Sequence, residues 1–412
     1  MNIKAPRGTK DIFGEVSVKF QEIILASNVF KQFNFEQIIT PIFESTDLFV
    51  RGIGETTDIV EKEMYTFEDK GGRSLTLRPE GTASVARAYG EHKMYQEGAK
   101  KFFYFGPMFR YERPQAGRYR EFYQMGVEVI GESSSLIDAE VIFMADKFLK
   151  TLSIENYSIE LNTLGCGSCR AEYQIALKAY LNKFREHLCD DCKRRLETNP
   201  LRVLDCKVES CRVHFVNAPT LEEYLDEECK EHFEGVKTYL TALGIKFNVN
   251  SKLVRGLDYY NRTVFEFVSQ ELGAQGTILG GGRYNNLVGE ICGGVDQPAI
   301  GFAAGMERMA MLMPTREIQT KKIAICWLGT ETALSAMKTR IDLSDAGYIT
   351  DMSYDTKSFK AQFKRANKEG VDFAVIIGSD EYAKGVVKIK NFKTEQECEV
   401  EMSRVVEYFK GV

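Results

Sequence analysis

The stretch FRYERPQAGRYREF, residues 109–122, decides the fold because it joins two segments that both have the composition of β-strands. KFFYFGPMFRY (101–111) and YREFYQMGVEVIG (119–131) flank it and are rich in aromatic and β-branched residues. Pro114 and Gly117 mark a turn between them, so the sequence predicts an antiparallel hairpin. The hairpin carries four arginines: Arg110, Arg113, Arg118 and Arg120.

These arginines allow two interpretations. Strand alternation places Arg110 and Glu112 on one face and lets Arg118 and Arg120 begin the return strand. In the first interpretation the arginines form a solvated surface and pair with neighbouring acids such as Glu121. In the second they grip a polyphosphate, because a planar guanidinium binds phosphate oxygens in a fixed geometry. The residues alone leave both interpretations open.

The length, composition and charge of the chain limit the classes of protein to which it can belong. Its 412 residues predict two or three domains, and 44% hydrophobic with 27% charged residues is ordinary for a globular protein. A net charge of −5 argues against a general nucleic-acid coat but leaves room for a local basic face. No apolar run approaches the length of a membrane span, and the first residues lack the features of a signal peptide. Ten cysteines without such a signal predict reduced thiols in the cytoplasm.

Hydrophobic periodicity divides the chain into two parts. The first part, 1–320, mixes strands with helices expected at 17–33 and 136–152. From about 165 to 240 the sequence becomes charged, helical and cysteine-bearing, which indicates an inserted module. The polar stretch 314–322 marks a break. Beyond it, residues 321–412 alternate strands and helices, as in a small α/β domain.

Two further segments carry chemistry. KLVRGLDYYNRTVFEFV (252–268) predicts strand structure, with Arg255 on it, and GTILGGGRYNNL (276–287) predicts a glycine-rich turn after a strand. Arg255 has a simple interpretation, an ion pair with Asp258 or Glu266.

The motifs together resemble those of one enzyme family. The arginine hairpin is similar to the second motif of class II aminoacyl-tRNA synthetases, GFAAGMERM (301–309) to the third, and TPIFESTDLF (40–49) to the first. VRGLDYYNRTVFEF (254–267) and GGGRYNNL (280–287) resemble the two signatures of histidyl-tRNA synthetases. LTLRPEGT (75–82) and NPLRVLDCK (199–207) resemble segments of bacterial members. The resemblance covers nearly the whole chain.

The resemblance implies a fold and an activity. The fold would be an α+β catalytic domain on a six-stranded antiparallel sheet, with flanking helices and a helical insertion, followed by a C-terminal α/β anticodon-binding domain. The activity would be the joining of L-histidine to tRNA-His in two steps, with ATP as its Mg²⁺ complex. The segment around Pro41 would form the interface of a homodimer.

The resemblance also assigns residues to ATP. Arg110 and Arg255 would contact the α-phosphate, and Arg308 the γ-phosphate, which makes these three the catalytic arginines. Three others would surround the nucleotide: Glu112 and Arg118 from the loop, and Phe122 stacked on adenine. Arg113 and Gln115, at the hairpin tip, would approach the 5′ end of the tRNA.

Histidine would occupy a neighbouring pocket. Glu80, Gly81 and Thr82 would meet its α-amino group, and Gln124 would bridge to its polar atoms. Arg110 and Arg255 would lie on the carboxylate side. Glu128 and Tyr260 would read the two imidazole nitrogens, between the rings of Tyr259 and Tyr284. For the tyrosines, the simpler interpretation is a half-buried strand position. The family usually has Asp-Gly where this chain has Asn285-Asn286, and none of its four histidines lies in a signature.

The cysteines of the inserted module remain ambiguous. They occur in spaced pairs, as in tetrahedral zinc sites, but the family does not require them. Idle reduced thiols are the alternative, and the sequence does not commit to a metal. The residues concerned are Cys166, Cys169, Cys189, Cys192, Cys206, Cys211 and Cys229.

Two other functions share parts of this pattern. A non-catalytic paralogue, the regulatory subunit of ATP phosphoribosyltransferase, shares the core but typically lacks the C-terminal domain and parts of the histidine signatures. An RNA-binding scaffold would not need an arginine set placed for ATP. In the C-terminal domain, SFKAQFKRANKEG (358–370) places Lys360 and Lys364 on one side of a helix, where either RNA or solvent could meet them.

Overall fold

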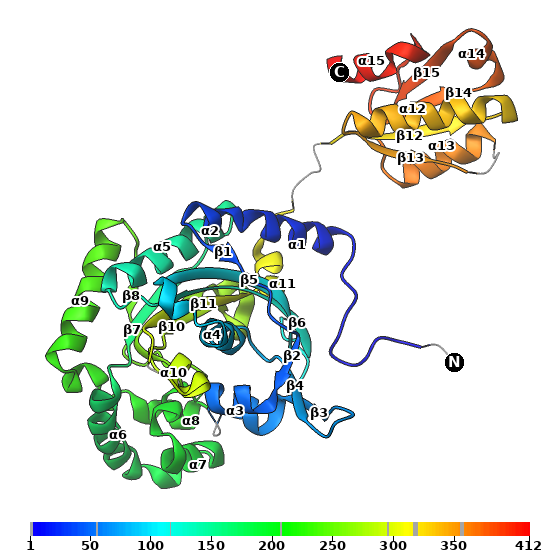
Figure 1. Ribbon diagram of the computed structural model, residues 1–412. Coiled ribbons are helices and arrows are strands. Elements are labelled where there is room, and N and C mark those ends of the chain that lie inside the picture. Colours follow the sequence, from blue (N-terminus) through cyan, green and yellow to red (C-terminus); the bar gives the residue numbers. More distant parts are fainter. Residues whose placement is uncertain are drawn as a thin grey trace. The chain divides into compact units, whose positions relative to one another are not determined.

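A computed structural model (Figure 1) describes residues 3–54, 57–115, 117–206, 208–294, 296–315, 320–354 and 358–412. The chain forms two compact units, Met1–Pro314 and Thr315–Val412. The predicted polar break at 314–322 falls partly outside the described residues. No described helix has the length and apolar character needed to cross a lipid bilayer.

The first unit is built on one large sheet. Its strand order is β1-β5-β6-β11-β10-β9-β7-β8. The bounds are β1 (Glu36–Gln37), β5 (Lys100–Phe109), β6 (Glu121–Ile130), β11 (Ala299–Gly305), β10 (Thr277–Arg283), β9 (Asn261–Val268), β7 (Ser158–Thr163) and β8 (Asn248–Val249). The middle six strands pair antiparallel, whereas the short edge strands β1 and β8 pair parallel with β5 and β7. The predicted six-stranded antiparallel sheet is therefore the centre of a mixed eight-stranded sheet.

The alternation of side chains along β6 separates a core from the site. Met125, Val127 and Val129 point into a core made with helices on one face of the sheet. Gln124, Gly126 and Glu128 lie on the opposite face because successive strand residues point to opposite sides. The core-side helices are α1 (Glu15–Ala26), α2 (Asn28–Gln32), α5 (Ser135–Thr151), α9 (Glu227–Ala242) and α11 (Met306–Leu312). On the other face lie α4 (Thr82–Glu91) and α10 (Leu287–Cys292) (Figure 1).

A smaller sheet carries the first motif. It has the order β2-β4-β3, with β2 (Phe43–Ser45), β4 (Ser74–Leu77) and β3 (Tyr65–Glu68), and α3 (Thr46–Ile53) follows β2. Arg78 is buried and donates to the carbonyls of Thr40 at 3.0 Å and Pro107 at 2.9 Å. This side chain ties the first motif to β5.

Two local predictions were wrong. The single helix at 17–33 is two helices, α1 and α2, which meet at Ser27, whose hydroxyl turns back to the Ile24 carbonyl at 2.6 Å. Arg118 and Arg120 do not begin the return strand, since β6 starts at Glu121. The Arg120 amide instead donates to the Gly8 carbonyl at 2.7 Å, so the N-terminal segment crosses the loop there.

Two of the signature segments also differ from expectation. The GGG run is not a turn: Gly280, Gly281 and Gly282 lie inside β10 and pair with both β9 and β11. Arg255 is not on a strand, because residues 250–260 form a loop before β9. Arg202 contacts that loop by donating to the Gly256 carbonyl.

The chain between β7 and β8 forms a helical module that ends in α9 (Figure 1). Its other α-helices are α6 (Gly167–Asn182), α7 (Asp190–Thr198) and α8 (Glu209–Arg212), and one of its 3₁₀ turns is η4 (Pro200–Asp205). Leu177, Leu181 and Leu196 pack with five of the cysteines in its core.

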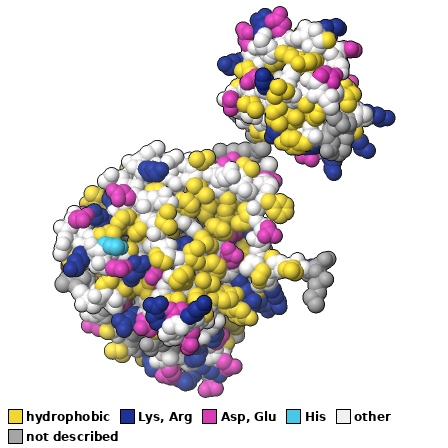
Figure 2. Space-filling model, turned by 45° about the vertical axis from the view of Figure 1, so that its right-hand side comes forward, with side chains coloured by type: hydrophobic (Ala, Val, Ile, Leu, Met, Phe, Trp, Pro, Cys, Tyr) yellow, Lys and Arg dark blue, Asp and Glu magenta, His cyan; other side chains and the backbone are white. Residues whose placement is uncertain are grey.

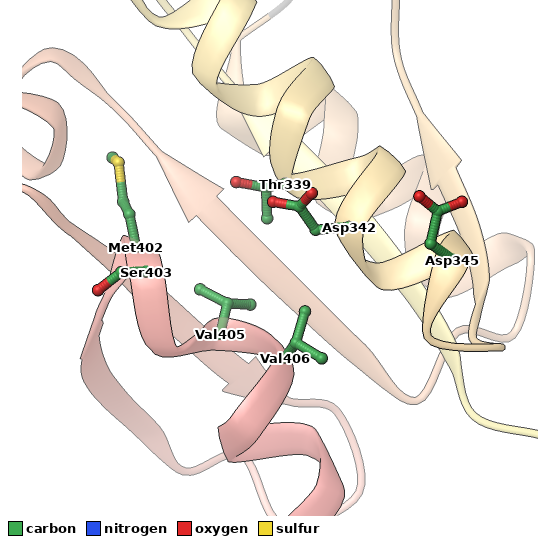
Figure 3. Close-up of a pocket in the computed structure, with 7 residues that line it drawn as sticks. All are labelled: Thr339, Asp342, Asp345, Met402, Ser403, Val405 and Val406. Atoms are coloured by element: carbon green, nitrogen blue, oxygen red, sulfur yellow. The ribbon is translucent and has the colours of Figure 1, made fainter.

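The second unit is a five-stranded sheet in the order β13-β12-β14-β15-β16. Its elements are β12 (Lys322–Trp327), α12 (Ala333–Asp345), β13 (Ile349–Met352), α13 (Phe359–Lys368), β14 (Phe373–Ile377), α14 (Ser379–Ala383), β15 (Val386–Asn391), β16 (Glu397–Glu401) and α15 (Val405–Gly411). Lys360 and Lys364 are exposed on α13, while Phe359 and Phe363 stack at 6.1 Å on its inner side. Figure 3 shows a depression between α12 and α15 whose charged lining side chains are Asp342 and Asp345, a poor surface for RNA phosphates.

Candidate active site

The loop between β5 and β6 brings its arginines to Glu112 and Arg308. Glu112 lies 2.9 Å from Arg118 and 3.9 Å from Arg110. Arg308, on α11, reaches the loop through its Nε, which donates to the Gly117 carbonyl at 3.4 Å. Burial lowers the pKa of Arg308, and the positive charges of Arg118 and Arg110 lower it further. Several cations thus converge in a partly buried place, which favours an anionic ligand.

The remaining residues of the loop point elsewhere. Arg120 stacks over the Tyr111 ring at 3.7 Å, and Arg113 and Gln115 are exposed at the tip. Phe122, by contrast, lies on β6 and presents its ring to the Arg110 guanidinium at 5.4 Å. Of the four arginines in the hairpin, the structure brings two, Arg110 and Arg118, close to Arg308.

Arg255 is held beside this group by residues of β9 and β10. Its guanidinium forms an ion pair with Glu266 and lies 5.6 Å from the centre of the Tyr260 ring. Thr277 links the two parts of the site: its hydroxyl donates to Glu266 at 3.1 Å, and its carbonyl accepts from Arg308 at 2.7 Å. Burial opposes the charge of Arg255, but Glu266 raises its pKa. The simple ion pair considered for Arg255 is therefore present, and it fixes the guanidinium in place.

A buried carboxylate lies on the same face of the sheet. Glu128 is 1% exposed and accepts from the Thr82 hydroxyl at 2.7 Å and from the Tyr284 hydroxyl. Burial raises the pKa of Glu128 to about 8. Tyr259 packs against Tyr260 at 4.6 Å and against Tyr284 at 5.6 Å, so three aromatic rings enclose the carboxylate's neighbourhood. Tyr284, rather than Tyr260, is the phenol bonded to Glu128 here.

Glu80 starts the helix that faces this pocket. Its carboxylate accepts from the backbone amides of Thr82 at 2.7 Å and Ala83 at 2.8 Å, as an acid at a helix N-terminus does. Burial nevertheless raises its pKa. The side-chain oxygen Oε1 of Gln124 is buried without a hydrogen-bond partner among the described residues, so a polar ligand would satisfy it.

Two strand glycines make room for the site. A Cβ at Gly280 would lie 2.5 Å from Arg255 Nη1, and a Cβ at Gly301 would overlap the carboxylate of Glu128. Gly280 and Gly301 lie on β10 and β11, under these two side chains. The glycines of the signatures are therefore needed for close approach and not for a phosphate-binding turn.

A buried ion pair joins β10 to α5 beside the pocket. Arg283 is fully buried and pairs with Asp138 of α5, which also bonds His232 at 2.8 Å. Burial opposes ionisation of Asp138, but Arg283 and His232 hold its pKa below the ordinary value. The side-chain oxygen of Asn285 accepts from Arg283 and from the Ala299 amide, each at 3.2 Å. The asparagine, which replaces the family's usual Asp, therefore forms hydrogen bonds that hold the turn after β10.

Arg283→Ala should destabilise the catalytic unit by about 3–5 kcal/mol, because it leaves the buried Asp138 charge without its cation. Urea unfolding followed by circular dichroism measures this change. Arg212→Ala serves as the control, since its pair with Glu209 is exposed and worth at most about 1 kcal/mol. Equal effects of the two substitutions would show that the buried pair has no special role.

Sequence reasoning missed several residues of the site. Tyr104 of β5 is buried against Gly81 and Gly126, and nothing in KFFYFG distinguishes it from a core aromatic residue. Thr277 and Arg283 lay inside quoted segments, yet their roles depend on partners far away in the sequence. The predicted residues Glu80, Thr82, Gln124, Glu128, Arg255, Tyr259, Tyr260 and Tyr284 occupy one face of the sheet, around the pocket of Glu128.

This sheet, with the arginine loop, the first motif and the arginine of α11, defines a class II aminoacyl-tRNA synthetase. The histidyl-tRNA synthetase family model matches residues 24–309, and the anticodon-binding domain model matches 322–411. The chain belongs to the histidyl-tRNA synthetase family. It is 48% identical to the histidine–tRNA ligase of Halothermothrix orenii, with 99% of each chain covered, and 47% identical to that of Aquifex aeolicus, with 98% of this chain and 100% of that one covered.

Solved structures agree with this assignment. Apo histidyl-tRNA synthetase of S. aureus is 37% identical, with a TM-score of 0.81 over 99% of this chain and 100% of that one. A Bacillus halodurans structure described as an ATP phosphoribosyltransferase regulatory subunit/histidyl-tRNA synthetase is 19% identical, with a TM-score of 0.65 over 92% of this chain and 98% of that one, and shares the fold.

Proposed function

We propose that this chain is a histidine–tRNA ligase that works in two steps at the site around Glu128. In the first step the histidine carboxylate attacks the α-phosphorus of ATP, which enters as its Mg²⁺ complex, and pyrophosphate leaves. In the second step a hydroxyl of the 3′-terminal adenosine of tRNA-His attacks the histidyl carbonyl, and AMP leaves. The single observation that carries the proposal is the convergence of Arg110, Arg118 and Arg308 beside a buried, carboxylate-containing pocket.

The first step needs position and charge rather than a base. The attacking carboxylate is already ionised, so no proton must be removed. Arg110 and Arg255 would contact the α-phosphate and neutralise the charge that develops there. Arg308 would hold the γ-phosphate, Glu112 and Arg118 would position the nucleotide, and Phe122 would stack on adenine. The pairing of Arg255 with Glu266 supports this role, because it fixes the guanidinium before substrate binds.

Histidine would be recognised by the pocket of Glu128. Its imidazole would donate to Glu128 and accept from Tyr260, while Tyr259 and Tyr284 enclose the ring. Its α-amino group would meet Glu80, Thr82 and the chain at Gly81. The unpaired Gln124 oxygen supports a polar substrate at this place.

The tRNA would contact both units. Arg113 and Gln115 are exposed at the loop tip and would approach the 5′ end of the acceptor arm. The second unit would bind the anticodon, with backbone contacts from lysines such as Lys360 and Lys364 and sequence read from unstacked bases. We propose that the chain works in the cytoplasm, where tRNA is charged. The regulatory paralogue remains less well supported, because this chain keeps Arg110, Arg255, Arg308 and the second unit.

Charging of a tRNA-His transcript tests the whole proposal. Labelled histidine should become bound to tRNA when ATP and Mg²⁺ are present, and a transcript of another tRNA should remain uncharged. Absence of charging by a folded protein that binds histidine would favour the regulatory function instead.

We also propose a two-fold homodimer, formed through the first motif. Ile39 is 83% exposed and Phe43 is 52% exposed, and Phe67 packs beside Phe43. Hydrophobic side chains gather on the face of the first unit seen in Figure 2. Apolar patches of this kind on soluble proteins usually mark an interface, and two-fold symmetry is the commonest assembly.

Ile39→Glu together with Phe43→Glu should convert the dimer to a monomer, because the charges would be buried in the interface. Sedimentation velocity at micromolar concentration measures the change. Ile175→Glu, an exposed position on α6, is the control and should leave the dimer intact. A wild-type chain that sediments as a fully active monomer would contradict the assembly.

A further inference from the structure

The seven cysteines of the helical module gather in two groups. Cys189, Cys192, Cys206 and Cys211 form the first, and Cys166, Cys169 and Cys229 form the second together with Asp226. Within each group the four candidate ligand atoms all lie within 4.8 Å of one another. Asp226 could not be found from cysteine spacing, because it joins the group only when the first turn of α9 meets the first turn of α6.

The distances between sulfur atoms fit a shared metal better than a disulfide. Cys189 and Cys206 have their sulfurs 3.9 Å apart, and Cys166 and Cys169 have theirs 3.4 Å apart. A tetrahedral ion with metal–sulfur bonds of about 2.3 Å separates its sulfur ligands by about 3.8 Å. A disulfide brings them to about 2.05 Å.

Backbone amides point at these sulfurs in both groups. In the first group, the Cys189 amide donates to Cys211 at 3.2 Å and the Val208 amide donates to Cys206 at 3.4 Å. In the second group, the Asp226 amide donates to Cys169 at 3.2 Å. Such N–H groups stabilise thiolates and orient metal ligands, as outer hydrogen bonds do at metal sites.

The second group also positions a carboxylate oxygen. Asp226 accepts from the Cys229 amide at 2.8 Å through Oδ1, which leaves Oδ2 directed to Cys166 at 3.1 Å. One carboxylate oxygen is thus fixed by the backbone, and the other is turned toward the three sulfurs. Asp226 thereby supplies the fourth ligand of the second group.

We propose that the inserted module binds two zinc ions, one in each group. Four ligands with thiolate in the majority select zinc among the common divalent ions, and a closed set of four marks a structural ion without an open position for chemistry. The proposal is independent of the proposed function.

The two ions would fix different parts of the module. The second joins the start of α6, where the insertion begins, to the start of α9, the last helix of the insertion. The first fixes the end of η4, and Asn199 and Arg202 from that turn hold Asp258 at 3.0 and 3.1 Å. Asp258 belongs to the loop that carries Arg255, so the first ion would steady that loop through η4.

Metal analysis of the full-length chain, purified without chelator, should find about two zinc ions per chain. Cys192→Ser and Cys229→Ser should each lower the content to about one, and the double variant should bind none. Cys292→Ser and Cys398→Ser should retain two, since both thiols are exposed and lie outside the groups. Zinc contents well below one in the wild-type chain, or iron in place of zinc, would overturn the proposal.

A second measurement avoids variants that fail to fold. Zinc released from the wild-type chain by a mercurial thiol reagent should appear as the seven grouped thiols react, in a ratio of about two ions to seven thiols. Hydrogen exchange after chelation should increase in 166–229 and in 254–258, while β5 and β6 remain protected. Seven thiols that react freely without releasing metal, or disulfides found by mass, would contradict it.

Discussion

Arg255→Ala should lower the rate of histidine-dependent ATP–pyrophosphate exchange by about 10²–10³, because it removes a preorganised donor from the developing charge at the α-phosphate. The KM for histidine should change much less, as expected of an interaction made mainly in the transition state. Arg255→Lys should recover part of the rate, since a point charge cannot reproduce the planar fork. Transfer of histidine from preformed adenylate to tRNA should be less affected, because the bond that Arg255 is proposed to help form is already made.

The ion pair with Glu266 supplies the control. Glu266→Gln loses the ion pair but keeps the guanidinium, so its exchange rate should fall far less than that of Arg255→Ala. If Arg255 served only the ion pair, the two substitutions would lower thermal stability and both reaction steps alike. That result would contradict the catalytic role.

Glu128→Gln should raise the KM for histidine by about 10- to 100-fold and leave ATP binding little altered. The change keeps the shape of the side chain but leaves one imidazole nitrogen poorly paired, which costs about 1–3 kcal/mol in a buried site. Exchange kinetics with histidine and with ATP as the varied substrate measure the two effects. Unchanged histidine affinity would show that the imidazole is read elsewhere.

The pH dependence of histidine affinity distinguishes the effect of the Glu128 charge from the effect of its shape. Burial raises the pKa of Glu128 to about 8, so its carboxyl is largely protonated in the empty site at neutral pH. An imidazole N–H donor favours the carboxylate, so histidine affinity should rise as the pH approaches 8. This rise should be absent in Glu128→Gln. If the wild-type affinity for histidine does not change between pH 7 and 8, the Glu128 carboxyl keeps its proton when histidine binds.

Local pattern predicted the elements better than their edges. The hairpin of β5 and β6, the helix after Pro79–Gly81 and the α/β order of the second unit follow from periodicity and turn residues. The start of β6 does not follow from such patterns, because the Arg120 amide donates to the carbonyl of Gly8, more than one hundred residues earlier. The short edge strands β1 and β8, of two residues each, have no pattern that a window could detect.

The site shows the same division. Arg110, Glu128 and Arg308 carried a recognisable context in their motifs, whereas Tyr104 and Thr277 are marked only by what they touch across the sheet. The interpretation of Gly280 also changed, from a turn residue to a strand residue that leaves space for Arg255. Asp226 needed two helices to meet before it could join three cysteines. Contacts between distant segments decide these cases, and no local pattern contains them.

We expect the pocket around Glu128 to activate histidine and no other amino acid. ATP–pyrophosphate exchange, measured separately with each of the twenty amino acids, tests it most directly, since it needs neither tRNA nor the second unit's contacts. Exchange that depends on histidine alone is the predicted result. Exchange driven by another amino acid, or none with any of the twenty, would show that this pocket does not activate histidine specifically.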